Sequence, residues 1–166
     1  FHDPDTFWPL RQELDHASSF VALAKLRRDF QFEMLIPGEV TKILDTTQLP
    51  KALLQSLVEN AYKYGVRSRA VGEASIVVRL EIQENRLRIE VIDNGLGIKN
   101  SSGLNQGSTK KGNKLILELF EVLNKYPPKN EFSFVVQERH EEDQIKGVTC
   151  SIVLPIHFNY PKSKYP

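Results

Sequence analysis

The sequence predicts an α/β (α+β) two-layer sandwich, in which a mixed β-sheet carries its helices packed on one face. Two observations lead to this fold class. Hydrophobic periodicities along the chain give the order helix, strand, helix, strand, strand, helix, strand, strand, which offers too few helical crossovers for a fully parallel sheet. The chain has 166 residues, 40% of them hydrophobic, which suits one sizeable core rather than two. We therefore expect a single globular domain.

The first two predicted elements are a helix and a strand. Apolar residues recur at helical spacing between residues 10 and 24, which indicates an amphipathic helix that ends near Arg28. Residues 30–36 then alternate between apolar and polar side chains, the period of a half-buried strand, and Pro37-Gly38 closes this strand.

A second helix and a hairpin follow. Pro50 stands where a first-turn proline is well placed, and an apolar stripe continues from there to Gly65, a suitable helix stop. Residues 76–82 and 87–91 both alternate with strand period, and a short polar turn at Glu84-Asn85 joins them. These two strands are expected to form a hairpin.

The last third of the chain begins with a change in composition. Residues 99–114 are rich in Gly, Ser, Asn, Thr and Lys, which predicts a mobile, locally basic loop. A third helix is expected over residues 114–125 and two strands over residues 132–136 and 148–154. The tail from residue 157 to 166 is expected to be loosely held.

Charge and cysteine content exclude several classes of protein. Lysines and arginines number 22 against 21 acidic residues, so no overall field favours nucleic acid or an anionic membrane. Cys150 is the single cysteine and the histidines are scattered, which argues against a disulfide or a metal centre of these residues. No apolar run reaches the roughly 20 residues that span a bilayer. The chain begins with Phe1, so we expect further sequence upstream of it. Any connection to a membrane is expected only through that upstream sequence. This domain itself is expected in the cytoplasm.

Polar residues gather on one side of the second predicted helix. Ser56, Asn60 and Lys63 share a face there, and Glu59 stands four residues before Lys63. The amide oxygen of Asn60 suits Mg²⁺, which takes oxygen ligands and usually keeps several waters, and Lys63 could then meet phosphate charge. Alternatively, this is a solvated face with one Glu59–Lys63 ion pair of little energetic value.

A second group of polar and glycine residues follows a predicted strand directly. Asp93 at the strand end, with Gly95 and Gly97 after it, lets the backbone turn sharply and approach a flat ligand, and a carboxylate is a strong acceptor for an exocyclic amine. The alternative is an ordinary turn, because Asp-Asn-Gly also starts such turns.

A third group lies where the basic loop enters the third predicted helix. Backbone N–H groups near Gly112-Asn113, with Lys110, Lys111 and Lys114 close in sequence, would make an anion site at a helix start. The alternative is a surface loop whose lysines serve only solubility.

In combination and in this order, these groups resemble the motifs of a known superfamily. Leu57-Val58-Glu59-Asn60-Ala61-x-Lys63-x-Gly65 resembles the N box, and Asp93-x-Gly95-x-Gly97 the first glycine box, of the GHKL ATPases. The Glu-Asn-Ala-x-Lys form and the preceding Leu-Pro-x-x-Leu-Leu-Gln at residues 49–55 are most similar to the LytS-type sensor histidine kinases. The similarity extends from about Leu10 to Pro155 and implies a Bergerat-type ATP-binding fold.

The resemblance implies a role for each matched residue. Asn60 would coordinate Mg²⁺, Glu59 would polarise water or orient the metal shell, and Lys63 would contact phosphate. Asp93 would accept the adenine amine of ATP. The remaining residues that the resemblance assigns to ATP are Gly95 and Gly97, which free the following loop to act as a lid, and Lys110, Lys111 and Gly112 near the phosphates.

The resemblance also implies partners and a division of the chain. Residues 1–28 would continue from an upstream dimerisation and phosphoacceptor helix, residues 29–156 would be the ATP-binding domain, and residues 157–166 a tail. The γ-phosphoryl of ATP would pass to a histidine upstream and then to a response regulator, and the full protein would be a homodimer.

The chain departs from the family pattern at several positions. Tyr64 stands where LytS-type kinases usually have histidine, and Lys114 replaces the second glycine of the second glycine box. Val148-Thr149 follows Gly147 where relatives carry Gly-Thr, so Thr149 is expected to face away from the site. His16 lacks the acceptor motif of the family, and we expect it to be a surface residue.

Alternative functions remain at this point. The domain could be a degenerate nucleotide-binding scaffold or sensor module of the same fold without kinase activity. A gyrase-like or chaperone-like ATPase would need a further domain, for which the chain has no room. A fold without a nucleotide site is the remaining alternative.

Overall fold

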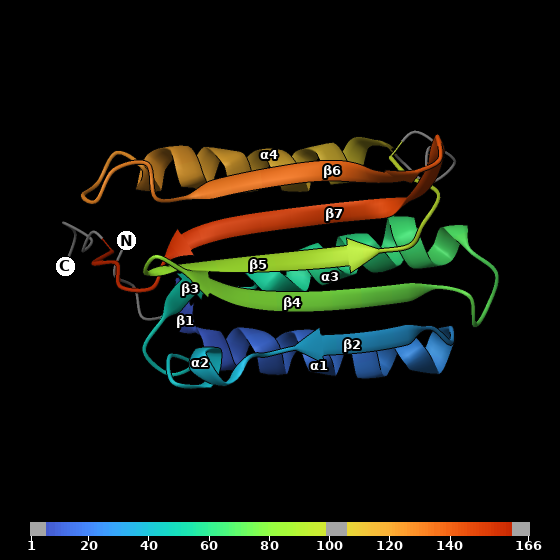
Figure 1. Ribbon diagram of the computed structural model, residues 1–166, viewed down its shortest axis with the longest axis horizontal. Helices are drawn as coiled ribbons and strands as arrows, with labels where there is room; N and C mark the ends of the chain where they lie inside the picture. The colour runs from blue at the N-terminus through green and yellow to red at the C-terminus, as the bar shows by residue number, and fades with distance from the viewer. Residues whose placement is uncertain (1–5, 99–105, 161–166) are drawn as a thin grey trace.

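The computed structural model describes residues 6–98 and 106–160 (Figure 1). For residues 106–111 it describes the backbone but not the side chains. Its strands are β1 (Phe7–Pro9), β2 (Gln31–Leu35), β3 (Gln48–Pro50), β4 (Ser75–Gln83), β5 (Arg86–Asp93), β6 (Ser133–Glu141) and β7 (Gln144–Pro155). Its α-helices are α1 (Leu10–Arg27), α2 (Gly38–Thr41), α3 (Leu53–Asn60) and α4 (Gln106–Leu123). A π-helical turn, η1 (Ala61–Gly65), and a 3-10 turn, η2 (Val66–Ser68), follow α3.

The main sheet has five strands in the order β2-β4-β5-β7-β6. Strand β2 runs parallel to β4 and the other neighbours are antiparallel, so the sheet is mixed. Helices α1, α3 and α4 all lie on one face of this sheet (Figure 1). The predicted two-layer sandwich is therefore confirmed.

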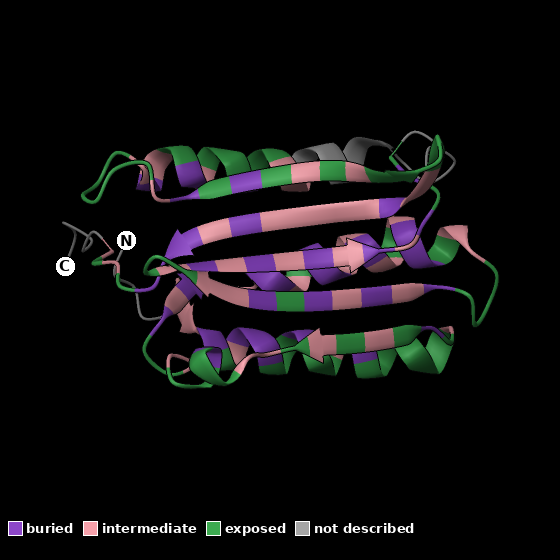
Figure 2. Ribbon diagram, viewed as in Figure 1, coloured by how far each residue is buried: buried purple, intermediate pink, exposed green. Residues whose placement is uncertain are grey.

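The core lies between this sheet and the helices. Strand β5 alternates along its whole length: Leu87, Ile89, Val91 and Asp93 are buried, and the residues between them are half-buried (Figure 2). Such alternation places every second side chain on the helical face. Each fully buried Leu or Ile contributes roughly 1.5–3 kcal/mol through loss of apolar surface from water.

The hairpin of β4 and β5 forms as predicted. Gln83 pairs with Arg86, and the two turn residues Glu84 and Asn85 have φ of 49° and 63°. Positive φ at both central residues is typical of the turn whose twist matches that of the flanking strands. At the other end Ile76 pairs with Asp93, so the hairpin fixes where β5 ends.

The prediction that Pro50 begins the second helix is wrong. Pro50 ends β3, which pairs with β1 in a separate two-stranded sheet, and α3 begins only at Leu53. Each of these strands has three residues, too few to show a period in sequence.

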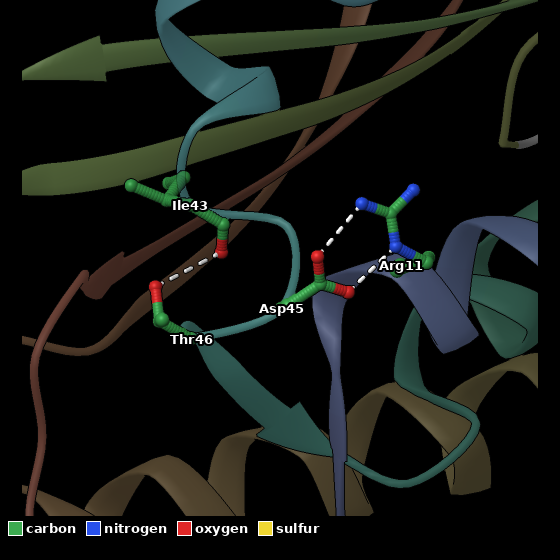
Figure 3. A network of polar contacts seen from close by, with 4 residues as sticks. All are labelled: Arg11, Ile43, Asp45 and Thr46. Carbon is green, nitrogen blue, oxygen red and sulfur yellow. Dashed lines mark hydrogen bonds and ion pairs between the residues drawn. The ribbon is translucent and has the colours of Figure 1, made fainter.

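The start of α1 is tied to the turn before β3. The Arg11 guanidinium donates to both carboxylate oxygens of Asp45 at 2.6 and 2.8 Å, and Thr46 Oγ1 donates to the Ile43 carbonyl at 3.4 Å (Figure 3). The paired guanidinium lowers the pKa of Asp45. These contacts hold the chain segment that leads into β3 and α3.

The C-terminal third differs most from the sequence-based expectation. Helix α4 begins at Gln106 rather than at residue 114, so residues 106–113 are helical and not part of a loop. Strands β6 and β7 form a hairpin much longer than the predicted strands, with φ of 48° and 63° at its turn residues Glu142 and Asp143. The extended part is largely exposed and polar, so it carries little hydrophobic period.

The first residues of the tail are held by aromatic contacts. The ring of Tyr160 stacks on that of Phe7 at a centroid distance of 3.8 Å, and its hydroxyl donates to the Gln48 carbonyl at 2.7 Å. Phe158 packs edge-on against Phe132. The expected loose tail is therefore wrong for residues 157–160, and residues 161–166 lie outside the described part. None of the described helices is long and apolar enough to cross a membrane.

Candidate functional site

Helix α3 carries the first group of predicted site residues. Leu53, Leu54, Leu57 and Val58 are its buried residues, which leaves Ser56, Glu59 and Asn60 on its other side. The helix does not stop at Gly65 as predicted, because it widens into the π-turn η1 and continues as η2 to Ser68. Single π-turns within helices are frequent at functional sites.

An open groove of about 280 Å³ lies between the start of α3 and helix α4. It brings Glu59 and Asn60 together with Gly112, and a methyl group on Gly112 would lie 3.9 Å from Asn60 Nδ2. The groove is lined by Pro50, Lys51, Ala52, Leu53, Ser56, Glu59, Asn60, Gly112, Leu115, Ile116 and Leu119. One wall is therefore polar and the α4 wall is apolar, as in sites for small organic ligands.

Glu59 is held by two neighbours on its own helix. Gln55 Nε2 donates to Glu59 Oε1 at 2.9 Å, and Lys63 Nζ lies 3.7 Å from Glu59 Oε2. The expected Glu59–Lys63 ion pair is thus present. Lys63 does not line the groove, and its side chain is 50% exposed.

Asp93 lies at the end of β5, where the residue is only 7% exposed. Its Oδ1 accepts the Gly95 N–H at 2.8 Å and the Val148 N–H at 3.4 Å. Among the described residues, none donates a hydrogen bond to Oδ2. Burial raises the pKa of Asp93 to about 6, against the opposing effect of these N–H groups and of Arg139. A buried carboxylate with one free oxygen is a typical acceptor for a ligand amine.

Two glycines pack directly against Asp93. A methyl group on Gly65 would lie 2.6 Å from Asp93 Cγ, and one on Gly95 would lie 2.5 Å from Gly65 Cα. Only glycine fits such a close approach. Gly65, which the sequence suggested as a helix stop, instead lets η1 reach the end of β5 and so joins the Asn60 and Asp93 groups.

The backbone after Asp93 is held by the β6–β7 hairpin. Gly97 has φ of +90°, and a methyl group there would meet Ile145 Cγ2 at 2.7 Å and Glu138 Oε1 at 2.8 Å. Glu138 Oε1 accepts the Ile98 N–H at 2.7 Å, and Arg139 Nη2 donates to the Asp93 carbonyl at 2.7 Å. Gly97 is therefore required by backbone shape and close packing.

Glu138 and Arg139 also belong to this region, although no sequence motif indicates them. They lie more than forty residues beyond Asp93 in the chain, so only the pairing of β5, β7 and β6 brings them near it.

Strand β7 confirms the expected orientation of Thr149. Val148 pairs with Asp93 and Thr149 pairs with Ile92, so Thr149 lies on the face of the sheet opposite to Asp93. Gly147 has φ of +124°, and a methyl group there would lie 1.9 Å from the Asp93 carbonyl oxygen.

Burial raises the pKa of Cys150 to about 12, which keeps this thiol unreactive at neutral pH.

The anion site predicted at a helix start is placed wrongly. Lys110, Lys111 and Gly112 lie inside α4, whose first residue is Gln106, so the N–H groups near Gly112 belong to the helical ladder. Gly112 does line the groove, whereas the side chains of Lys110 and Lys111 lie outside the described part. Lys114 is exposed, pairs with Glu118 at 3.5 Å, and has no positive φ.

The described side chains offer few ligands for a metal ion. Over the described residues, no group of three or more His, Cys, Asp and Glu side chains could hold one. Mg²⁺ suits such a site only when phosphates and water supply most ligands, with one or two oxygens from the protein. The oxygens of Glu59 and Asn60 in the groove fit that requirement. His16, by contrast, is exposed, and its ring lies tilted against that of Trp8 at a centroid distance of 4.3 Å.

Comparison with known proteins finds sensor histidine kinases that are similar to part of the chain. No protein-family model matches it. An uncharacterized sensor-like histidine kinase of Staphylococcus epidermidis is 33% identical over 92 residues, which are 55% of this chain and 17% of that protein. Sensor protein kinase HptS of Staphylococcus aureus is 32% identical over the same length. The chain thus spans only a small part of the curated relatives it matches.

Solved structures extend the comparison to most of the chain. The Acinetobacter baumannii histidine kinase AdeS has a TM-score of 0.59 at 10% identity, covering 92% of this chain and 67% of that one. The catalytic domain of histidine kinase ThkA has a TM-score of 0.51 at 14% identity, covering 90% and 95%. The chain therefore has the fold of histidine kinase catalytic domains, and over about half of its length it is homologous in sequence to sensor histidine kinases.

Proposed function

We propose that this domain binds ATP with Mg²⁺ and is the ATP-binding catalytic domain of a two-component sensor histidine kinase. The γ-phosphoryl group would pass to a histidine outside this chain. One observation carries the proposal: η1 joins a buried carboxylate with a free oxygen, Asp93, to a groove that contains Glu59 and Asn60. Homology to sensor histidine kinases supports it.

Asp93 would recognise the base. Its Oδ1 is occupied by two backbone N–H groups, which fixes the carboxylate, and Oδ2 would accept the adenine amine. A carboxylate with a pKa of about 6 is ionised at neutral pH and accepts strongly. Gly65 and Gly95 keep side chains away from this acceptor.

Asn60 and Glu59 would act at the phosphate end. The Asn60 amide oxygen would be a ligand of Mg²⁺, and Glu59, held by Gln55, would orient water in the metal shell. Bound Mg²⁺ neutralises phosphate charge, which is the main requirement of phosphoryl transfer. Gly112, which lines the groove, and Lys63, which pairs with Glu59, would complete the phosphate surroundings.

The partners follow from this function. The domain would act on a phosphoacceptor helix upstream in its own chain or in the second copy of a homodimer, and a response regulator would receive the phosphoryl group. ThkA was solved in complex with response regulator protein TrrA, with a TM-score of 0.53 to this chain at 10% identity, covering 92% of this chain and 42% of that one. The domain would lie in the cytoplasm, where ATP is available.

The second glycine box, Gly112-Asn113-Lys114-Leu115, is the motif whose altered form raised the alternative of a nucleotide-binding scaffold without kinase activity. Lys114 replaces a glycine of the family pattern, but it lies in α4 with helical backbone, so no strain arises from it. Backbone strain at Lys114 therefore gives no reason to prefer the scaffold, and kinase activity remains the function we propose.

The experiment is transfer of ³²P from labelled ATP in the full-length protein. We expect an acid-labile, base-stable label that Asn60→Asp reduces strongly, and that Lys114→Gly changes little. A full-length protein that binds ATP yet stays unlabelled, and gains label on Lys114→Gly, would favour the scaffold.

A further inference from the structure

A carboxylate of α1 is fully buried against the start of α3. Glu13 is 0% exposed, and the two helices pack against each other. The Ala52 N–H donates to Glu13 Oε1 at 2.6 Å and the Leu54 N–H donates to Oε2 at 2.9 Å. Both carboxylate oxygens are thus used, and each is bound to the same short backbone segment.

Helix α3 has no cap of its own at this end. Its N-cap residue, Ala52, lacks a side-chain oxygen and has φ of 60°, a left-handed conformation that alanine rarely adopts. The first N–H groups of a helix need partners, and the positive end of the helix dipole favours an anion there. Glu13, on a different helix, supplies both the hydrogen-bond acceptors and the negative charge. No ion pair between described residues involves Glu13, so the helix end is its main electrostatic partner.

The segment that Glu13 holds is also a wall of the groove. Ala52 and Leu53 line the groove together with Glu59 and Asn60. Asn60 lies two turns further along the same rigid helix, about 10 Å from Leu53 at 1.5 Å per residue. A shift of the α3 start relative to α1 would therefore move the groove wall and Asn60 together.

We propose that Glu13 is a positioning residue, which fixes α3 relative to α1 and so makes nucleotide affinity depend on the placement of α1. The inference rests on the proposed function for its ligand, since the groove is the proposed phosphate end of the ATP site. It adds a regulatory connection, because Glu13 is the point at which α1 binds the site helix.

The test compares Glu13→Gln with Val21→Ala. Glutamine keeps the shape, but its NH₂ group faces one of the two backbone donors, so one hydrogen bond is replaced by a donor–donor contact. Val21 is buried on the same helix and does not line the groove, so Val21→Ala controls for lost stability. If Glu13→Gln lowers stability too far, both substitutions are made in an Ala52→Gly background, where the left-handed residue is no longer strained.

Affinity for ADP with Mg²⁺ is measured by calorimetry on folded samples, beside Tm. We expect Glu13→Gln to weaken binding by about tenfold, since small misplacement of a site costs that much or more. Val21→Ala should lower Tm with unchanged affinity. Equal affinity in wild type and Glu13→Gln, with a lowered Tm, would contradict the proposal and leave Glu13 a purely structural residue.

Hydrogen exchange of the same samples without nucleotide separates this inference from the proposed function. We expect Glu13→Gln to speed exchange of amides from Leu54 to Gly65, which Val21→Ala should leave protected. If wild type binds no nucleotide, the proposed function fails, whereas faster exchange in this segment would still support positioning of α3 by Glu13. Unchanged exchange would overturn it.

Discussion

Two buried carboxylates set the chemistry of this domain at the scale of single residues. Burial raises the pKa of Asp93 to about 6 and that of Glu13 to about 7, although backbone N–H groups oppose both shifts. A carboxylate kept away from water at such an energetic cost usually has a task. For Asp93 the task proposed here is acceptance of a ligand amine, and for Glu13 it is support of helix α3.

The raised pKa of Asp93 predicts how stability changes with pH. Between pH 3.8 and about 6 the folded state binds more protons than the unfolded state, so the contribution of Asp93 to stability falls as pH rises. A shift of this size corresponds to up to about 3 kcal/mol. We therefore expect the free energy of unfolding of wild type, relative to Asp93→Asn, to fall from pH 4.5 to pH 7.5 in urea titrations. A difference between the two proteins that is constant with pH would contradict this.

Gly147 is expected to be irreplaceable because of its backbone. Its φ of +124° disfavours any side chain, and a methyl group would overlap the Asp93 carbonyl oxygen at 1.9 Å. Gly147→Ala should cost about 3 kcal/mol or more in free energy of unfolding. Gly38→Ala is the matched control, since nothing lies within 4 Å of its added methyl group, and it should change stability by less than about 1 kcal/mol. Equal effects of the two substitutions would refute this account of Gly147.

At the scale of secondary-structure elements, α4 is fixed to the sheet by one asparagine at its end. Asn124 Nδ2 donates to the Phe132 carbonyl at 2.8 Å, and its Oδ1 accepts the Phe132 N–H at 2.9 Å. These two bonds join the end of α4 to the residue before β6. They thereby help to hold the apolar wall of the groove.

Loss of this pair should weaken the fold moderately. We expect Asn124→Ala to lower the free energy of unfolding by about 2 kcal/mol, because two part-buried backbone groups lose their partner. The exposed Asn159→Ala should change it by less than about 0.5 kcal/mol. Chemical denaturation of the two variants measures these changes in the free energy of unfolding. An Asn124→Ala protein as stable as wild type would show that water replaces the two hydrogen bonds to Phe132.

The elements that the sequence predicted are those with a strong hydrophobic period. The patterns of α1, β2, β4 and β5 predict bounds close to the observed ones, since one face of each is buried or, in β2, half-buried. The pair β1–β3 is too short to show a period, and the outer part of β6–β7 is exposed and polar. The start of α4 is polar and contains glycine, so its composition predicts a loop although the segment is helical.

Local motifs also explain which site residues could be predicted. Glu59, Asn60, Asp93 and Gly95 belong to short contiguous patterns, whereas the contact of Gly65 with Asp93 depends on the tertiary packing of η1. Long-range partners such as Glu13 with Ala52 leave no mark in a single sequence. The roles given to the predicted site residues stay predictions.

At the scale of the whole molecule, an aromatic cluster joins the two ends of the described chain. Phe7, Phe132, Phe158 and Tyr160 form a continuous set of ring contacts that includes β1 and the first residues of the tail. The division at residues 28 and 156 stays a prediction, but Phe158 and Tyr160 pack on the same core.

The cluster makes the tail a contributor to global stability. Tyr160→Ala should lower the free energy of unfolding by about 3 kcal/mol, since it removes a packed ring. Tyr160→Phe removes only the hydrogen bond to Gln48 and should cost about 1 kcal/mol. Thermal or urea unfolding distinguishes the two, and a Tyr160→Ala protein as stable as wild type would mean that the tail is not part of the cooperative unit.

The most direct measurement is calorimetric titration of the folded domain with ATP, with and without Mg²⁺, beside Asp93→Asn and Asn60→Ala. We expect saturable binding by wild type that Asp93→Asn loses under both conditions, because the base acceptor is gone. Asn60→Ala should lose only the part of the affinity that depends on Mg²⁺. No heat at millimolar ATP from a folded sample, or full affinity in Asp93→Asn, would contradict the proposed nucleotide site.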